Sequence, residues 1–283
     1  MINKFSFSAV AVALSLSLSS IACAVPSYNL SVDGMFSNDA DLKGTDSSVK
    51  TSSVGFSLSN QYFTVAYKNS SYDFSGDVDP FSSLHKLTFD ARYEAYFATN
   101  LKYYLGLNVG TLFEDDISLS DSYLLSPRVA LGWTFMKGWT VYGGAYANLN
   151  AADNIFLPIV GLQIGNDSDL GWSGALAYPE TKIQYRFNRS LAADLTYLTV
   201  CDTYYISESV DHKGKDTDGY YREEAQGASL GVTYSFNDTM HLSGGVFSYF
   251  DRELKFYDNS GDETISLDAD DNVGAYARFS FSF

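Results

Sequence analysis

The feature that most constrains this chain is a two-residue alternation of apolar and polar side chains, which recurs from Tyr28 to the last residue. Between residues 85 and 97, one set of alternate positions is apolar and the interleaved set is mostly charged. The apolar set is Leu87, Phe89, Ala91, Tyr93, Ala95 and Phe97, and the interleaved set is Lys86, Thr88, Asp90, Arg92, Glu94 and Tyr96. A period of two predicts strands with one apolar face. No comparable segment beyond residue 24 has a 3.6-residue apolar period, so we expect little helix.

Fourteen segments fit this pattern and are predicted to be strands. They are 28–36, 49–58, 62–72, 85–97, 101–113, 123–135, 139–149, 156–165, 171–178, 181–187, 191–206, 223–236, 240–256 and 273–283. Two of them, 171–178 and 181–187, are short for spanning strands, so a 12-stranded alternative stays open. Pro127, Pro158 and Pro179 are expected at strand ends, where a missing N–H is tolerated.

The connections between these segments alternate between short and long over most of the chain. An even number of alternating strands of about ten residues, joined in this way, is typical of an all-β, antiparallel transmembrane β-barrel of the bacterial outer membrane. Short periplasmic turns and longer extracellular loops then place both termini on the periplasmic side. Two connections depart from the rhythm, because 166–170 is intermediate and 179–180 is brief where a long loop is due.

A soluble β-sandwich would also alternate, so the alternation by itself does not decide between the two folds. Glycines and charged residues share the polar face, which suits a barrel lumen. The apolar face places large rings next to the short turns, as an aromatic girdle at a membrane interface requires. These rings are Phe97, Trp133, Phe135, Trp139, Phe187, Phe236, Phe279, Phe281 and Phe283.

The first 24 residues fit a cleaved secretory signal peptide, with Lys4 before an apolar run and Ala22-Cys23-Ala24 before the expected cut. A lipid-modified Cys23 is the rival interpretation, but Ser20 stands where Leu is usual. Residues 25–283 are then expected to form one outer-membrane β-barrel domain. Cleavage of the signal peptide removes Lys4 and changes the formal net charge from −16 to −17. So acidic a chain lacks the basic surface that a nucleic-acid partner would require. Only Cys201 remains, so an intrachain disulfide is excluded.

The C-terminus resembles the β-signal of Gram-negative outer-membrane proteins. Phe279, Phe281 and the terminal Phe283 alternate with small or polar residues on an amphipathic last segment. The resemblance covers about ten residues, and the size and strand number are similar to those of porin-like channels of 12 to 14 strands, without a narrower family. It implies an assembly signal recognised by the barrel-assembly machinery, with periplasmic chaperones as transient partners and outer-membrane lipid and lipopolysaccharide as surroundings.

Lys and Arg side chains are costly at the bilayer midplane, so we assign the charged residues of the strands to the lumen. The predicted pore-lining residues are Lys68, Lys86, Asp90, Arg92, Glu94, Lys102, Arg128, Lys182, Arg186 and Arg278. Asp33 and Asp194 are expected on the same wall, which is then basic overall. Such a wall favours anionic solutes in a pore. In the alternative interpretation, the bases pair with acids on neighbouring strands and brace the wall.

The acidic residues lie mainly in the predicted outer loops, above all in 251–272 and 114–121. Asp268, Asp270 and Asp271, or Asp258 and Asp262, could supply oxygen ligands to Ca²⁺. No EF-hand pattern is present, and acidic loops are usually just solvated. We therefore expect no metal site and no cofactor.

Enzyme motifs are weak in this chain. Gly227 to Gly231 matches G-x-S-x-G, but Ser229 falls within a predicted strand, whereas a nucleophile elbow needs a strand-to-helix turn. The histidines are His85, His212 and His241, and the pair Asp211-His212 lies near Glu208. Adjacent residues of an extended chain point to opposite sides, so Asp211 and His212 would not pair directly. We expect no enzyme, with a rim-located hydrolase as an alternative.

The sequence thus predicts a porin-like channel in the bacterial outer membrane, for passive or weakly selective diffusion of small hydrophilic solutes. Fourteen strands predict a narrow pore, and an inward-folded loop would close it. A structural or surface role of the barrel is the other alternative.

Overall fold

The computed structural model describes residues 27–76, 80–166, 168–207 and 218–283. The predicted signal peptide and the residues Asp79, Glu208, Asp211 and His212 lie outside these ranges. Within them, the chain forms strands and no helix, and no helix long and apolar enough to cross a membrane is found. All fourteen predicted strands are present, to within a few residues at each end.

The described strands are numbered in chain order. They are β1 (Asn29–Ser37), β2 (Ala40–Asp41), β3 (Ser48–Ser59), β4 (Phe63–Ser75), β5 (Ser83–Ala98), β6 (Leu101–Phe113), β7 (Tyr123–Met136), β8 (Trp139–Asn150), β9 (Asn154–Ile164), β10 (Gly171–Tyr178), β11 (Thr181–Arg186), β12 (Leu191–Ile206), β13 (Gly219–Ser235), β14 (Met240–Asp258), β15 (Glu263–Ala269) and β16 (Asn272–Ser282).

The sheet closes on itself because β1 pairs antiparallel with both β16 and β3. The short β2 pairs only with β3, and β15 pairs only with β14. Leaving these two out of the sixteen described strands gives a closed antiparallel barrel of fourteen. The prediction of fourteen is confirmed, and the 12-stranded alternative is wrong, because β10 and β11 both pair into the wall despite their length.

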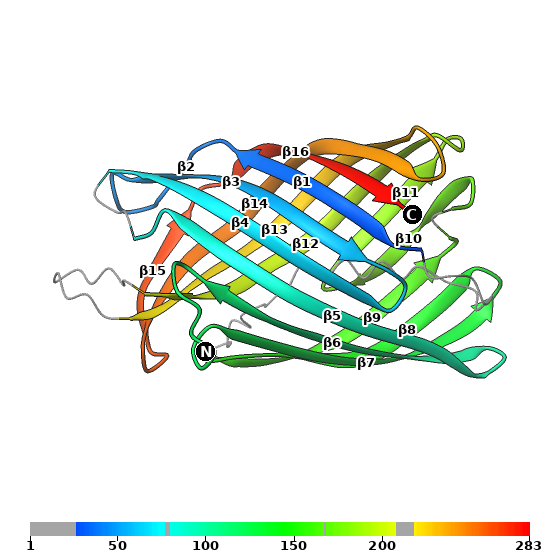
Figure 1. Ribbon diagram of the computed structural model, residues 1–283, viewed down its shortest axis with the longest axis horizontal. Helices are drawn as coiled ribbons and strands as arrows, with labels where there is room; N and C mark the ends of the chain where they lie inside the picture. Colours follow the sequence, from blue (N-terminus) through cyan, green and yellow to red (C-terminus); the bar gives the residue numbers. More distant parts are fainter. Residues whose placement is uncertain (1–26, 77–79, 167, 208–217) are drawn as a thin grey trace.

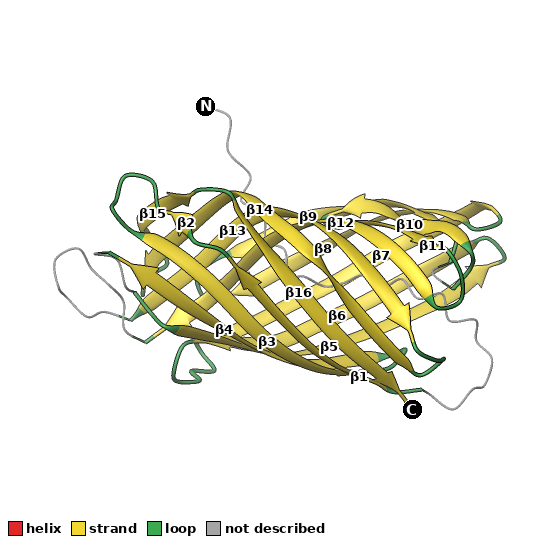
Figure 2. Cartoon of the chain, turned by 90° about the horizontal axis from the view of Figure 1, so that it is seen from above, coloured by secondary structure: helices red, strands yellow, loops and turns green. Residues whose placement is uncertain are grey.

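The strands run obliquely around the barrel, with the C-terminus at one end and β2 and β15 at the other (Figure 1). Following the connection lengths, we call the end that holds the C-terminus the periplasmic end and the opposite end the outer end. Loops gather at both ends of the barrel in the second view (Figure 2).

The outside of the barrel is apolar, as the alternation predicts. Leu87 and Phe89 on β5 are 41% and 43% exposed, while their neighbour Asp90 points inward and is 8% exposed. Leu105, Leu107, Val129, Leu131 and Trp133 continue this exposed surface on β6 and β7. A soluble sandwich would bury such side chains, whereas a barrel in a membrane can expose them to lipid without a cost in free energy.

Two prolines depart from their expected places. Pro127 and Pro158 lie inside β7 and β9 and not at strand ends. The β7–β8 ladder is interrupted at Pro127, as expected for a residue that has no N–H to donate, while Pro127 keeps its register partner Leu107 on β6. Pro158 lies on the outer part of β9, which β10 does not reach, and a strand edge tolerates a missing N–H.

Candidate functional site

The inner wall at mid-barrel holds two ion pairs, one between adjacent strands and one that reaches across an intervening strand. Arg128 on β7 donates to Asp90 on β5, and Lys102 Nζ on β6 lies 2.8 Å from Glu94 Oε1 on β5. Arg128 and Lys102 are almost fully buried, at 6% and 1% exposure. Charges removed from water are tolerated when they are paired, so these contacts brace one side of the lumen.

Glycine makes room for these large side chains. A Cβ at Gly106, which pairs with Arg128, would lie 2.9 Å from the arginine Nε. A Cβ at Gly132 would lie 2.9 Å from the Tyr142 ring and 3.0 Å from Lys102 Cγ. Lys102 Nζ lies 4.9 Å from the centre of the Tyr142 ring, a cation–π contact. The glycines of the polar face therefore serve to pack lumenal charge.

A second group of ion pairs lies toward the outer end, and one of its pairs joins strands that are far apart in the sheet. Lys86 Nζ on β5 lies 2.7 Å from Asp202 Oδ1 on β12, and Arg252 Nε on β14 lies 2.8 Å from Glu223 Oε1 on β13. Asp202, Glu223 and Arg252 were not among the predicted pore-lining residues. Asp202 could have been found, because it shares strand parity with Asp194. Arg252 falls both in the predicted strand 240–256 and in the acidic segment 251–272 that we expected in an outer loop, and β14 in fact extends to Asp258.

The outer half of the lumen is filled by apolar and aromatic side chains, which we call the outer core. Its members are Ala40, Leu42, Val49, Tyr72, Phe81, Leu84, Leu112, Leu124, Tyr204, Ile206, Tyr221, Leu254, Phe256 and Ala269. They come from most of the circumference of the barrel. Phe81, from the connection between β4 and β5, packs at their centre, with its ring centroid 4.6 Å from that of Tyr221 and 5.0 Å from that of Tyr72. The outer core therefore fills part of the lumen toward the outer end.

The periplasmic half of the lumen is more accessible to water. Arg278 on β16 faces inward opposite Asp33 on β1, with Nη2 3.7 Å from Oδ1, and its side chain is 55% exposed. Arg92 Nη2 donates to the backbone carbonyl of Asn60 at 2.7 Å, next to a periplasmic turn. The two halves of the lumen therefore differ, because the periplasmic half has an exposed charged side chain, whereas the outer half holds buried ion pairs beside the outer core.

The remaining predicted pore-lining residues lie on the same wall. Lys68 on β4 pairs in register with Gly55 and Lys86. Lys182 on β11 pairs in register with Thr196, and Arg186 Nη1 donates to the carbonyl of Arg189 at 3.4 Å. Their role in conduction stays a prediction.

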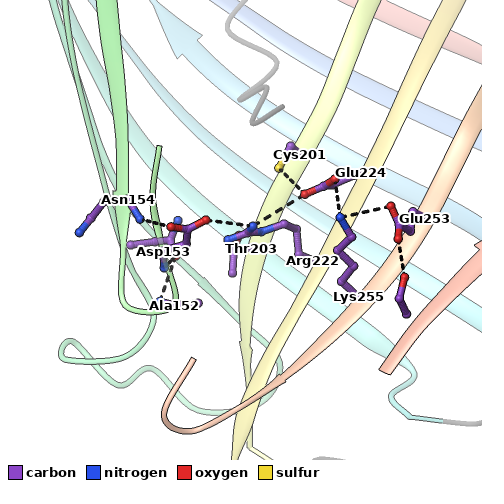
Figure 3. A network of polar contacts seen from close by, with 11 residues as sticks. Ala152, Asp153, Asn154, Cys201, Thr203, Arg222, Glu224, Glu253 and Lys255 are labelled. Atoms are coloured by element: carbon purple, nitrogen blue, oxygen red, sulfur yellow. Dashed lines mark hydrogen bonds and ion pairs between the residues drawn. The ribbon is translucent and has the colours of Figure 1, made fainter. Parts of the chain in front are cut away.

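A further polar network lies at the outer end, on β13 and β14 and the turn between β8 and β9 (Figure 3). Arg222 Nη1 lies 3.3 Å from Asp153 Oδ2 and 3.7 Å from Glu224 Oε1. Lys255 Nζ lies 2.8 Å from Glu224 Oε2 and 3.2 Å from Glu253 Oε2. The contact between Arg222 and Asp153 ties the end of β9 to β13, although the two strands are not neighbours in the sheet.

The C-terminal aromatic residues lie on the outside of β16. Phe279 and Phe281 are each 38% exposed, and Phe283 is 63% exposed. The ring centroids of Phe281 and Phe283 lie 5.9 Å apart in a stacked arrangement. The terminal strand thus carries an exposed aromatic ridge, and its role as an assembly signal stays a prediction.

The residues of the enzyme motifs lie within strands or contact polar side chains of neighbouring strands. Ser229 lies inside β13, so the strand-to-helix turn of a nucleophile elbow is absent there. His85 Nδ1 lies 2.8 Å from Tyr67 Oη and 3.1 Å from Asn69 Nδ2, and His241 Nδ1 lies 2.8 Å from Ser235 Oγ.

Metal-ligand clusters of three or more His, Cys, Asp or Glu side chains are not found in the described ranges. Asp258 Oδ1 instead accepts the N–H groups of Ser260 and Asp262, which shapes a turn. Asp270 lies 3.8 Å from Lys43 Nζ in an exposed ion pair.

No family model matches the chain, and no curated protein sequence matches it either. The fold is that of an outer-membrane β-barrel. Solved structures with a similar fold include the NanC porin, at 9% identity and a TM-score of 0.42 over 90% of this chain and 100% of that chain. An outer-membrane channel from Pseudomonas putida F1 has 12% identity and a TM-score of 0.44, covering 93% and 97%. The Pseudomonas putida toluene transporter TodX has 11% identity and a TM-score of 0.36, covering 95% and 91%.

Proposed function

We propose that the protein is an outer-membrane channel for passive or weakly selective diffusion of small hydrophilic solutes, with a preference for anions. The observation that carries this proposal is Arg278, an inward-facing arginine whose side chain is more than half exposed. An inward side chain is exposed only where the lumen holds solvent. The periplasmic half then acts as a water-filled vestibule, and the outer core acts as its closed end.

The preference for anions follows from the charges of that vestibule. Arg278 faces Asp33 at 3.7 Å, which is too long for a tight pair, and the arginine side chain is more than half exposed. Its guanidinium group keeps a positive field toward the lumen, and basic groups bias a pore toward anions. The deeper pairs, such as Arg128 with Asp90, are neutral overall and brace the wall.

Reversal potentials in planar bilayers under a salt gradient test this selectivity. The wild type is expected to prefer anions, and Arg278→Glu is expected to shift the reversal potential toward that of a cation-selective pore. Lys137→Glu is the matched control, because Lys137 is exposed at the periplasmic turn between β7 and β8, outside the lumen. A cation preference of the wild type, or equal shifts in both variants, would contradict the proposal.

A structural role is the second candidate, and the outer core is the observation that favours it. A barrel whose outer half is packed with buried apolar side chains resists axial flow. The two candidates differ in whether the outer core opens. Discrete conductance steps from the wild type or from a variant with a weakened core support the channel, and their absence from both supports the structural role.

A further inference from the structure

β15 is an edge strand at the outer end of the barrel. It pairs with the part of β14 over Arg252–Tyr257, and no other described strand pairs with it. The preceding segment of β14, 240–251, rises roughly 30 Å along the barrel axis at a strand tilt of about 40°, which exceeds the apolar band of about 25 Å. β15 therefore lies beyond the hydrocarbon layer, at the end of the barrel opposite the C-terminus (Figure 1).

The chain itself shows which backbone groups of β15 face its free edge. The N–H of Lys43, just after β2, donates to the carbonyl of Asp268 at 2.8 Å, so that carbonyl points away from β14. Backbone groups of a strand alternate between its two sides, so Ser266 presents its N–H and C=O groups to the same side as Asp268. The chain turns away at Gly44, which has a φ of +82°. No described strand lies opposite Ser266 on that side.

The two faces beside this free edge differ in chemistry. Ile265 and Leu267 are half-buried and pack against the outer core, so the inner face is apolar. Asp268 alternates with them on the other face, is exposed, and has Glu253 of β14 as its register partner. The segment 258–272 carries no Lys or Arg, and its acidic residues are Asp258, Asp262, Glu263, Asp268, Asp270 and Asp271. The free edge therefore has apolar side chains on one face and carboxylates on the other.

Charge decides which kind of strand fits this edge. A second copy of the chain would bring its own carboxylates against those of β15, and like charges opposite each other destabilise strand pairing. Charged side chains on edge strands oppose self-association in this way. A basic segment would instead place opposite charges across the same positions. The carboxylates of the edge are thus complementary to a basic partner and not to a second copy.

We propose that the free edge of β15 binds an extended peptide segment of a partner protein, in which basic and apolar residues alternate. The segment continues the antiparallel line that Lys43 begins, and its backbone is hydrogen-bonded to Ser266. Its basic side chains lie toward Asp268 and Glu253, and its apolar side chains lie beside Leu267. Strand addition takes affinity from main-chain hydrogen bonds and specificity from alternate side chains. The proposal does not depend on whether the lumen conducts.

A synthetic peptide tests this proposal on the whole barrel. The probe is a fluorescein-labelled peptide of alternating lysine and valine, and the protein is held in nanodiscs of phosphatidylcholine, which has no net charge. Fluorescence anisotropy should show binding that weakens as salt is raised, because exposed charges are screened. Two matched peptides should not bind, one with glutamate in place of lysine and one with N-methyl groups along the lysine peptide's backbone. Equal binding of the N-methylated peptide would show attraction by charge alone and would overturn the proposal.

Two substitutions of Ser266 test the hydrogen bond at the edge. Ser266→Pro removes the N–H that faces the edge, and a strand edge tolerates proline, so the ladder between β14 and β15 should persist. The loss of one hydrogen bond should weaken binding of the lysine–valine peptide about tenfold. Ser266→Ala removes only the hydroxyl group and should keep the affinity of the wild type. Equal affinities of the two variants would contradict strand addition.

A pair of charge reversals tests the position of the carboxylates. Asp268→Lys on β15 and Asp115→Lys in the connection between β6 and β7 change the net charge equally, and both residues are exposed. Asp268→Lys should abolish peptide binding, and Asp115→Lys should leave it nearly unchanged. Equal losses would mean that the peptide binds the acidic outer surface in general, which rules out the site.

Two measurements separate this result from other causes. Heat modifiability on gels checks that each variant is folded, and bilayer conductance of the same preparations reports the lumen separately. Analytical ultracentrifugation of the wild type in detergent is expected to show a monomer. A dimer that Ser266→Pro dissociates would assign the edge to a second copy and would refute the basic partner.

Discussion

Replacing Phe81 by Ala should both destabilise the barrel and favour an open lumen. The Phe81 side chain is 4% exposed, and its ring contacts those of Tyr72, Phe74 and Tyr221 at centroid distances of 5.0, 5.4 and 4.6 Å. Removing a buried phenylalanine costs about 3–5 kcal/mol in protein cores. Phe81 lies in a connection and not in a barrel strand, so we expect about 3 kcal/mol, at the lower end.

The same contacts form only when the outer core is closed, so this cost also shifts the equilibrium between closed and open lumen. At 1.4 kcal/mol per factor of ten, about 3 kcal/mol corresponds to roughly a hundredfold increase in the ratio of open to closed molecules. Single-channel recording in planar bilayers should then show a large rise in open probability. Urea unfolding in lipid vesicles should show the loss of stability in parallel.

Leu119→Ala is the control for this prediction. Leu119 is also apolar and also lies in an outer connection, but it is 81% exposed, so its removal should change the free energy of unfolding by less than about 0.5 kcal/mol. The reasoning is refuted if Phe81→Ala has the conductance and stability of the wild type. It is equally refuted if Leu119→Ala opens the lumen as much as Phe81→Ala does.

Three further predictions concern charge and assembly. Asp90→Asn should lower the free energy of unfolding by about 3–5 kcal/mol, because it leaves Arg128 buried without its partner; a double variant with Arg128→Gln should recover much of this loss, and urea titration compares the two. Deleting Phe283 should reduce insertion into the outer membrane, measured by heat modifiability, whereas Phe135→Ala, which removes a ring 46% exposed elsewhere in the girdle, should not. Hydrogen bonds from two neighbouring serine hydroxyls lower the pKa of Asp121, so its carboxyl group should titrate below the ordinary value of 3.8 in an NMR experiment. The contribution of these hydrogen bonds to stability is then present above pH 3.8 and is lost as the pH falls through the lowered pKa.

The sequence predicts those contacts of the candidate site that follow from strand parity. It does not predict the contacts that form only because the sheet closes into a barrel. Alternation places Asp90 and Arg128 on the inner face, and their contact spans only two strand spacings. Lys86 and Asp202 are 116 residues apart, and only the curvature of the closed barrel brings their side chains within hydrogen-bond distance. The outer core does not follow from the sequence for a related reason: Leu84 and Leu112 have the parity of the polar face, where we expected a water-filled lumen.

The sequence by itself determined the class of fold, because a period of two with one apolar face has few stable solutions, and the connection lengths select a barrel with a periplasmic and an outer end. The sequence also indicates the short hairpin of β10 and β11, as two short predicted strands joined by residues 179–180. The tertiary structure decided what the lumen contains. Whether an inward side chain meets water, a charge or an aromatic core depends on which strands face each other across the barrel, and that is set by closure and register. For the same reason, the sequence does not show the contact between Arg222 and Asp153, because the two residues belong to parts of the wall that are not neighbours in the sheet.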